Sequence, residues 1–330
     1  MTAPLEEVRT CELCGDTRQR IFEVYERFGE HFPLVECEGC GLGYLNRRPT
    51  EAAMPEWYDR AYGTRHRDWC PNPLREVKFR MVRALLRLRQ RGGPGRLAAL
   101  PLERRWQRML ARNHMQGTAP FARILDVGCG HGAWLAGMRR FGFDCHGVDT
   151  AAESAEAART AGLAAHHGSL ESAAYPDGHF AVVRFHHVLE HLHHPVRALT
   201  EAARILAPGG RCVVTVPNHA GVARQVFRHS EDVPYHLYAF TPDTLGQAMD
   251  RAGLRRLTLH TETPHPHSIY SYLALRAVEW LNDAPEATRR AAEEFWSVAN
   301  EDRVREFRAT MEFFDAIGRG TQIVAVGERP

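Results

Sequence analysis

Four cysteines near the N-terminus have the residue type and the spacing of a metal site. Cys11 and Cys14 form one Cys-x-x-Cys pair, Cys37 and Cys40 form a second, and 22 residues separate the two pairs. Each second cysteine precedes a glycine, which suits the tight turn that aims two thiolates at one tetrahedral zinc ion. Because four thiolates leave no open coordination position, we expect a structural Zn²⁺. Redox-active dithiols and plain core cysteines are the alternatives.

A second group of residues combines glycines with two acids. An apolar run that contains Asp126 leads into Gly128, Gly130 and Gly132, and Asp149 ends the next short apolar stretch. Glycines at alternate positions permit positive φ and let a ligand approach the backbone. The order of strand, glycine loop, helix, strand and acid is that of a nucleotide-binding βαβ unit.

Two families of cofactor-binding protein fit this loop. Gly128, Gly130 and Ala133 satisfy the dinucleotide pattern, so an NAD-dependent oxidoreductase is one alternative. Asp126 inside the strand end and the third glycine, Gly132, indicate a different family. The Asp-x-Gly-x-Gly-x-Gly segment resembles the loop of class I S-adenosylmethionine (SAM) methyltransferases.

Later segments extend the resemblance to the small-molecule branch of that family. They are residues 187–192, 204–210 and 232–241, so that the likeness spans about Ile124 to Leu254. Ser169 and Ala181 depart from it, since the family often has an acid at each position, the first of them near the adenine.

The resemblance implies a fold, a cofactor and a set of contacts. In that family the loop packs on the methionine part of SAM, and the acid after the second strand, here Asp149, holds the ribose hydroxyls. The cofactor-binding residues expected on this basis are Asp126, Gly128, Cys129, Gly130, Gly132, Asp149, Thr150, Ser169, Leu170 and His186.

Histidines near the ends of predicted strands are candidates for proton transfer. A hydroxyl or carbon acceptor must lose a proton, and a histidine near its ordinary pKa can take it. His187 follows a buried strand, and His236 lies in a tyrosine-flanked loop that should cap the same sheet edge. We expect His236 to be the base, with His187 and Tyr235 orienting the acceptor. His191 lies four residues beyond His187 on a predicted helix and is expected to be structural.

Strand and helix patterns alternate after residue 121, which predicts a doubly wound parallel sheet. The fold class expected is α/β, Rossmann-like and seven-stranded, with an antiparallel last strand. Apolar stretches at 21–25 and 34–36 predict a hairpin between the cysteine pairs. Five parts of the chain are expected: a zinc-binding module (1–48), a helical lid or connector (49–120), the SAM-binding core (121–262), a helical insertion (263–318) and the final core strand (319–330).

Composition limits the compartment and the partners. The 330 residues are 44% hydrophobic and 25% charged, with a net charge of +2. No signal peptide or long apolar run is evident, and the eight cysteines suggest a reducing environment, so a cytoplasmic protein without a membrane partner is expected. The resemblance to the small-molecule branch implies a small-molecule acceptor, in specialised-metabolite or sugar biosynthesis.

Two further functions stay open at this point. Residues 75–112 carry twelve Arg or Lys against two acids, which is compatible with a tRNA or rRNA methyltransferase. No RNA-binding motif accompanies this charge, so a nucleic-acid partner is not favoured. A non-catalytic SAM-binding or zinc scaffold protein is the other alternative. The identity of the acceptor, the atom methylated and the oligomeric state are not determined by the sequence.

Overall fold

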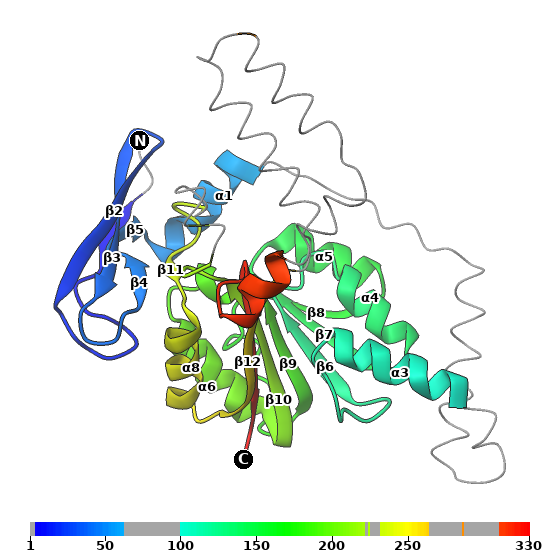
Figure 1. Ribbon diagram of the computed structural model, residues 1–330. Helices are drawn as coiled ribbons and strands as arrows, with labels where there is room; N and C mark the ends of the chain where they lie inside the picture. The colour runs from blue at the N-terminus through cyan, green and yellow to red at the C-terminus, as the bar shows by residue number, and fades with distance from the viewer. Residues whose placement is uncertain (1–3, 63–99, 222–223, 225–231, 264–285, 287–309) are drawn as a thin grey trace.

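The computed structural model describes residues 4–62, 100–221, 224, 232–263, 286 and 310–330. A seven-stranded sheet dominates these residues, and a smaller four-stranded sheet lies beside it (Figure 1). Among the described residues, no helix combines the length and the apolar character that crossing a membrane would require.

The large sheet has the strand order β12-β13-β10-β9-β6-β7-β8. Neighbouring strands from β10 to β8 are parallel, whereas β13 runs antiparallel to both β10 and β12. The seven-stranded α/β sheet with an antiparallel last strand is therefore confirmed. Its strands are β6 (Arg123–Val127), β7 (Asp144–Asp149), β8 (Ala164–His167), β9 (Phe180–His186), β10 (Leu206–Pro217), β12 (Arg255–Glu262) and β13 (Gln322–Glu328).

Helices cover both faces of this sheet, and alternate strand residues pack on opposite faces. Ile124 and Val182 belong to one buried cluster, with side chains of α3, α4 and α5. Leu125 and Val183 belong to the other, with side chains of α6 and α8. This division follows from the two-residue period of a strand. The helices are α3 (Leu100–Arg112), α4 (Ala133–Arg140), α5 (Ala152–Thr160), α6 (Pro195–Ile205) and α8 (Pro242–Arg251).

The smaller sheet, in the order β11-β4-β3-β2, joins the N-terminal residues to the core. Its hairpin of β2 and β3 confirms the predicted strands between the cysteine pairs. The fourth strand, β11, comes from the segment after β10, and Gly43 of β4 allows it to approach, because a Cβ there would lie 2.9 Å from that of Ala239. The strands are β2 (Gln19–Arg27), β3 (Glu30–Cys37), β4 (Gly43–Leu45) and β11 (Tyr238–Ala239).

A two-stranded ladder and short helices complete the description. The ladder pairs β1 (Leu5–Glu7) with β5 (Arg47–Pro49), and η1 (Glu51–Ala53) and α1 (Met54–Tyr62) follow it.

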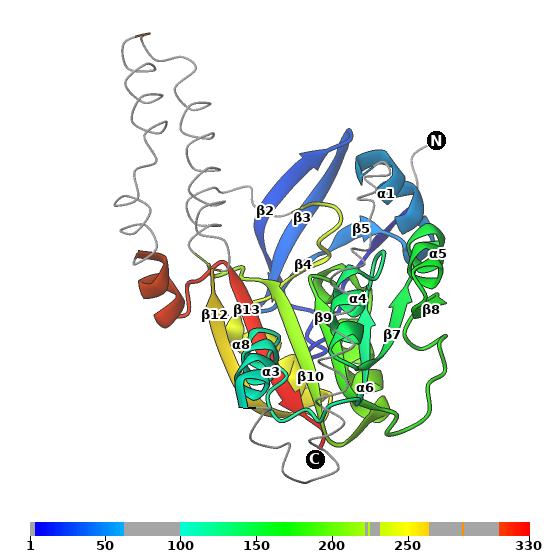
Figure 2. The same ribbon diagram turned by 90° about the vertical axis from the view of Figure 1, so that its right-hand side faces the viewer.

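Figure 2 shows the β2–β3 hairpin beyond the end of the large sheet that lies away from the C-terminus. Because β13 runs from that end toward the C-terminus and β10 runs the opposite way, this is the carboxyl end of the parallel strands.

The structure corrects one local prediction and leaves others outside the described residues. The helix expected to carry both His187 and His191 is only a 3-10 turn, η3 (Leu189–His191), and His187 precedes it with φ +53°. The two histidines therefore do not share a helix face. Within the expected helical connector at 49–120 the structure describes α1 and α3. Residues 63–99 of it and most of the insertion at 263–318 lie outside the described residues.

Candidate cofactor and acceptor site

The three glycines of the loop between β6 and α4 all have positive φ: +68° at Gly128, +52° at Gly130 and +75° at Gly132. A Cβ on Gly128 would lie 2.3 Å from Val188, and one on Gly132 would lie 2.3 Å from Leu163. A Cβ on Gly130 would meet no atom of the described residues within 4 Å. Packing therefore requires the two outer glycines, whereas the central glycine faces open space, as expected where a ligand lies against the backbone.

Asp149 at the end of β7 is hydrogen-bonded to this loop. Its Oδ2 accepts from the Gly130 amide at 2.8 Å, and its Oδ1 accepts from the Ala151 amide at 2.9 Å. The next residues expected at the cofactor follow β8: Leu170 is 4% exposed, and the Ser169 hydroxyl accepts from the Ser172 amide at 3.1 Å. The carboxyl ends of β6, β7 and β8 thus bring together residues that are widely separated in sequence.

Asp126 is buried beneath the loop rather than exposed to a ligand. It is 4% exposed, and one carboxylate oxygen accepts from Arg184 of β9 at 2.8 Å. Burial raises the pKa of Asp126 to about 6, an effect that the charge of Arg184 opposes. The guanidinium of Arg184 also lies 4.3 Å from the ring centre of Trp134. Asp126 is therefore placed to join β6 to β9, and its burial does not support the direct cofactor contact that the motif implied.

Cys129 and Thr150 differ in their access to a ligand. Cys129 is 8% exposed, and its thiol donates to the Gly130 carbonyl at 3.5 Å. Thr150 is exposed at the end of β7, and its carbonyl oxygen lies 3.2 Å from Nε2 of His167. Thr150 is the more accessible of these two expected cofactor residues.

A cavity of about 420 Å³ lies at the carboxyl ends of β9 and β10. His186 and His187 line it together with Gln322 and Glu262, which belong to the antiparallel strands β13 and β12. Nε2 of His187 lies 3.2 Å from Oε1 of Gln322, whose Nε2 donates to Glu262 at 2.8 Å. Sequence patterns missed Gln322 and Glu262, because only the pairing of β12 and β13 brings them to this edge.

Three histidines line this cavity: His114, His186 and His187. Burial, followed by the positive charges of Arg184 and His187, lowers the pKa of His186 to about 3. His186 is therefore neutral at physiological pH and a weak base. His187 has an exposed side chain, and its Nδ1 faces the Glu190 carboxylate at 3.6 Å.

Neither Tyr235 nor His236 lines the 420 Å³ cavity. Tyr235 is 2% exposed, and its hydroxyl donates to the Trp57 carbonyl at 2.9 Å, so the structure does not support a role in orienting the acceptor. The ring of His236 instead packs 4.7 Å from that of His191, at an interplanar angle of 75°. Burial lowers the pKa of His191 to about 4. His236 therefore belongs to a cluster with His191 and Glu190.

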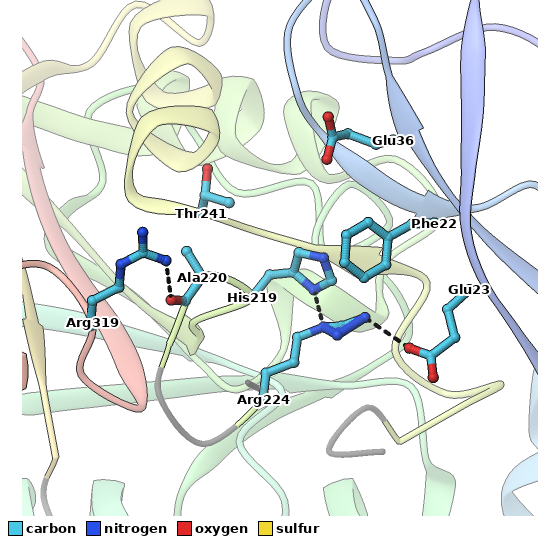
Figure 3. A pocket seen from close by; sticks show the side chains of 8 residues that line it. All are labelled: Phe22, Glu23, Glu36, His219, Ala220, Arg224, Thr241 and Arg319. Carbon is cyan, nitrogen blue, oxygen red and sulfur yellow. Dashed lines mark hydrogen bonds and ion pairs between the residues drawn. The ribbon is translucent and has the colours of Figure 1, made fainter. Parts of the chain in front are cut away.

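A second cavity, of about 550 Å³, lies between the smaller sheet and the segment after β10 (Figure 3). Arg224 crosses it, donating to Nδ1 of His219 at 2.7 Å and to the carboxylate of Glu23 at 3.2 Å. The ring of Phe22 meets that of His219 edge to face, with 5.4 Å between their centres. These contacts link β2 to the carboxyl edge of the large sheet.

The four N-terminal thiols converge as a metal site requires. Sulfur atoms of Cys11 and Cys40 are 3.6 Å apart, those of Cys14 and Cys37 are 3.4 Å apart, and all four lie within 4.8 Å of one another. Sulfurs 2.3 Å from a tetrahedral zinc ion are about 3.8 Å apart. The separations exceed a disulfide bond of about 2.05 Å, so the geometry fits a zinc site made of four cysteine thiolates.

The backbone around these thiols has a repeated turn. The amide of Gly15 donates to the Cys11 carbonyl, and the amide of Gly41 donates to the Cys37 carbonyl, both at 2.8 Å. Both glycines have positive φ, +80° and +78°. The glycine after each cysteine pair therefore makes the turn that the sequence predicted.

Comparison with known proteins identifies the family. A model described as a methyltransferase domain matches residues 81–259, which is more than half of the chain. The chain belongs to this methyltransferase family. Its fold and loop are those of class I SAM-dependent methyltransferases, and the match decides against the NAD-dependent oxidoreductase that the glycine spacing had left open.

Curated relatives of the methyltransferase match its core. It is 35% identical over 109 residues to the ubiquinone biosynthesis O-methyltransferase of Xanthomonas oryzae pv. oryzae, covering 31% of this chain and 46% of the relative. It is 35% identical over 108 residues to the protein of the same description from Psychrobacter cryohalolentis, covering 29% and 41%. The chain spans less than half the length of these relatives.

Among solved structures, the [4+2]-cyclase SpnF is similar to the methyltransferase. It is 18% identical and superimposes with a TM-score of 0.48, covering 86% of this chain and 97% of that protein. At this identity the likeness concerns the fold alone.

Proposed function

We propose that this methyltransferase transfers a methyl group from SAM to a hydroxyl oxygen of a small-molecule acceptor, in a biosynthetic pathway for a specialised metabolite or sugar. The observation that carries the proposal is the 420 Å³ cavity, which places His187 one strand away from the glycine loop of β6. The relatives named as ubiquinone biosynthesis O-methyltransferases support a hydroxyl group as the acceptor.

The residues of the chain divide into those that hold SAM and those that act on the acceptor. We assign the ribose hydroxyls to Asp149 and the methionine part to the loop at Gly130, which faces open space. Bound SAM supplies a methyl carbon on a positively charged sulfur, which leaves neutral. Binding both molecules at one sheet edge aligns the acceptor oxygen with that carbon, and this alignment is the main catalytic contribution.

His187 is the residue that we assign to proton removal, in place of His236. Its Nε2 lies at the cavity wall, and its Nδ1 faces Glu190. The acceptor O–H bond breaks as its proton moves to the imidazole, and the oxygen forms a bond to the methyl carbon. The carbon–sulfur bond breaks at the same time and its electron pair stays on sulfur, so the products are the methyl ether and S-adenosylhomocysteine.

Two experiments test this function. Thermal-shift measurements with SAM, S-adenosylhomocysteine and NAD should show stabilisation by the first two and none by NAD. Transfer of labelled methyl from SAM should then be measured over a panel of phenols and sugars, with total RNA as a separate acceptor. Methylation of RNA and of no small molecule would contradict the proposal and restore the alternative of an RNA methyltransferase.

A further inference from the structure

Glu190 is an acid buried next to the candidate site. The residue is 1% exposed and lies in η3, immediately after the carboxyl end of β9. Within the described parts of the chain, neither of its side-chain oxygens has a hydrogen-bond partner. An ionised carboxylate in such a place is costly unless a cation balances it. The surroundings of Glu190 should therefore show which cation this is.

The nearest ring nitrogens do not supply that charge through a hydrogen bond. Oε1 of Glu190 lies 3.6 Å from Nδ1 of His187 and 3.9 Å from Nε2 of His191, and both separations are too long for a hydrogen bond. The remaining member of the cluster is His236. One ligand atom from each of Glu190, His191 and His236 lies within 4.8 Å of the other two.

Two oxygens contact Nδ1 of His191 on the side of the ring away from Glu190. The backbone carbonyl oxygen of Tyr235 and the hydroxyl oxygen of Tyr58 each lie 3.0 Å from it. In the tautomer whose Nδ1 donates to these oxygens, Nε2 presents its lone pair toward Glu190, 3.9 Å away. Histidines that bind metals are commonly held in this way, with the second ring nitrogen donating to a carbonyl.

Glu190 is thus a buried carboxylate without a hydrogen-bond partner among the described residues, and two imidazoles lie beside it. We propose that Glu190, His191 and His236 bind a divalent first-row transition-metal cation. One carboxylate and two imidazoles suit Mn²⁺, Fe²⁺, Co²⁺ or Zn²⁺ and leave coordination positions for water or a ligand. This site is separate from the four cysteines and does not depend on the proposed methyl transfer. His191 then has a role beyond the structural one that the sequence indicated.

The fold holds these three residues in place before any ion binds. The amide of Leu237 donates to the Glu190 carbonyl at 2.8 Å, which ties the loop of His236 to η3. The amide of His236 donates to the Asp232 carbonyl at 2.9 Å. The Asp232 amide also lies 3.5 Å from Nδ1 of His236, at the long limit of a hydrogen bond.

The site also borders the glycine loop and the cavity. Val188, two residues before Glu190, packs against Gly128, and His187 lies between Glu190 and the cavity wall. An ion in this cluster would therefore lie close to the region in which ligands of this fold bind.

Total metal content tests the proposal. The zinc-loaded protein is dialysed against excess MnCl2, then against metal-free buffer, and bound zinc and manganese are counted by mass spectrometry. We expect about two ions per chain in the wild type, because Mn²⁺ prefers nitrogen and oxygen ligands to thiolates. Glu190→Gln and His236→Ala should each retain about one. His194→Ala removes an exposed imidazole from the same segment and should keep two.

The thermal midpoint separates loss of the ion from loss of the fold. Added MnCl2 should raise the midpoint of the wild type and of His194→Ala, and should leave that of Glu190→Gln and His236→Ala unchanged. Circular dichroism checks that both variants are folded, and His236→Ala provides the test if Glu190→Gln is not. The proposal is overturned if the wild type binds one ion and Glu190→Gln is more stable than the wild type. A buried carboxylate that no cation balances would explain both results.

Discussion

Val188 occupies the space that a side chain on Gly128 would need. A Cβ on Gly128 would lie 2.3 Å from one methyl of Val188 and 3.1 Å from the other. The segment after β9 therefore packs directly on the loop after β6, and Gly128 is required for this packing. Gly130, two residues later, has open space at the equivalent position.

The two glycines should consequently fail in different ways when replaced. Gly128→Ala should lower the free energy of unfolding by about 1–3 kcal/mol, because overpacking adds to an unfavourable positive φ. Gly130→Ala should lose less stability and should weaken SAM binding by at least about tenfold. Gly253→Ala has a similar positive φ and open space after α8, and it controls for backbone strain. Equal SAM affinity in the Gly130 and Gly253 variants, measured by calorimetry, would remove the cofactor from this loop.

Asp149 should contribute to SAM binding through the ribose hydroxyls. Asp149→Ala is expected to weaken binding by about 1–3 kcal/mol, the range for losing hydrogen bonds to a charged group. Asp144 begins the same strand at its other end, where its exposed carboxylate pairs with Arg123 and His146. Titration calorimetry of Asp144→Ala should give the wild-type affinity. An Asp149 variant that also binds like the wild type would show that the acid only supports the loop.

The cysteine cluster should hold about one Zn²⁺ that stabilises the protein. Replacing Cys37 with serine should release it and lower the free energy of unfolding, with SAM affinity largely retained, because metal binding is coupled to folding of the small sheet. Cys145→Ala, which removes a buried thiol of the core, should keep the zinc. Zinc content and denaturant unfolding measure both effects, and a wild-type protein that is folded without metal would contradict this prediction.

His187 should contribute to the chemical step rather than to SAM binding. Once an acceptor is found, His187→Ala is expected to lower the single-turnover rate by about 10²–10⁴-fold, the usual contribution of a general base, with little change in SAM affinity. His236 does not line the 420 Å³ cavity, so His236→Ala should lower the rate less than His187→Ala does. If both variants keep wild-type rates between about pH 6 and 9, catalysis consists of alignment alone.

Local features of the sequence determined the glycine loop, the cysteine turns and most of the elements. The positive φ at Gly130 and at Gly15 depends on the residue itself, and the alternation of strands and helices depends on side-chain periodicity. Similarly, α6 and α8 begin at Pro195 and Pro242, because the fixed φ of proline suits the first position of a helix. These are interactions over a few residues, and a sequence contains them directly.

Only the tertiary structure decided which distant groups meet. The pairing of β13 with β10 and β12 placed Gln322 beside His187, and the pairing of β11 with β4 joined the small sheet to the core. The contacts of Asp126 and Glu190 likewise involve residues more than forty positions away: the Arg184 side chain for the first and the Leu237 amide for the second. Strand register and burial are properties of the whole packed chain, so residue spacing alone could suggest candidate ligands but not bring them together.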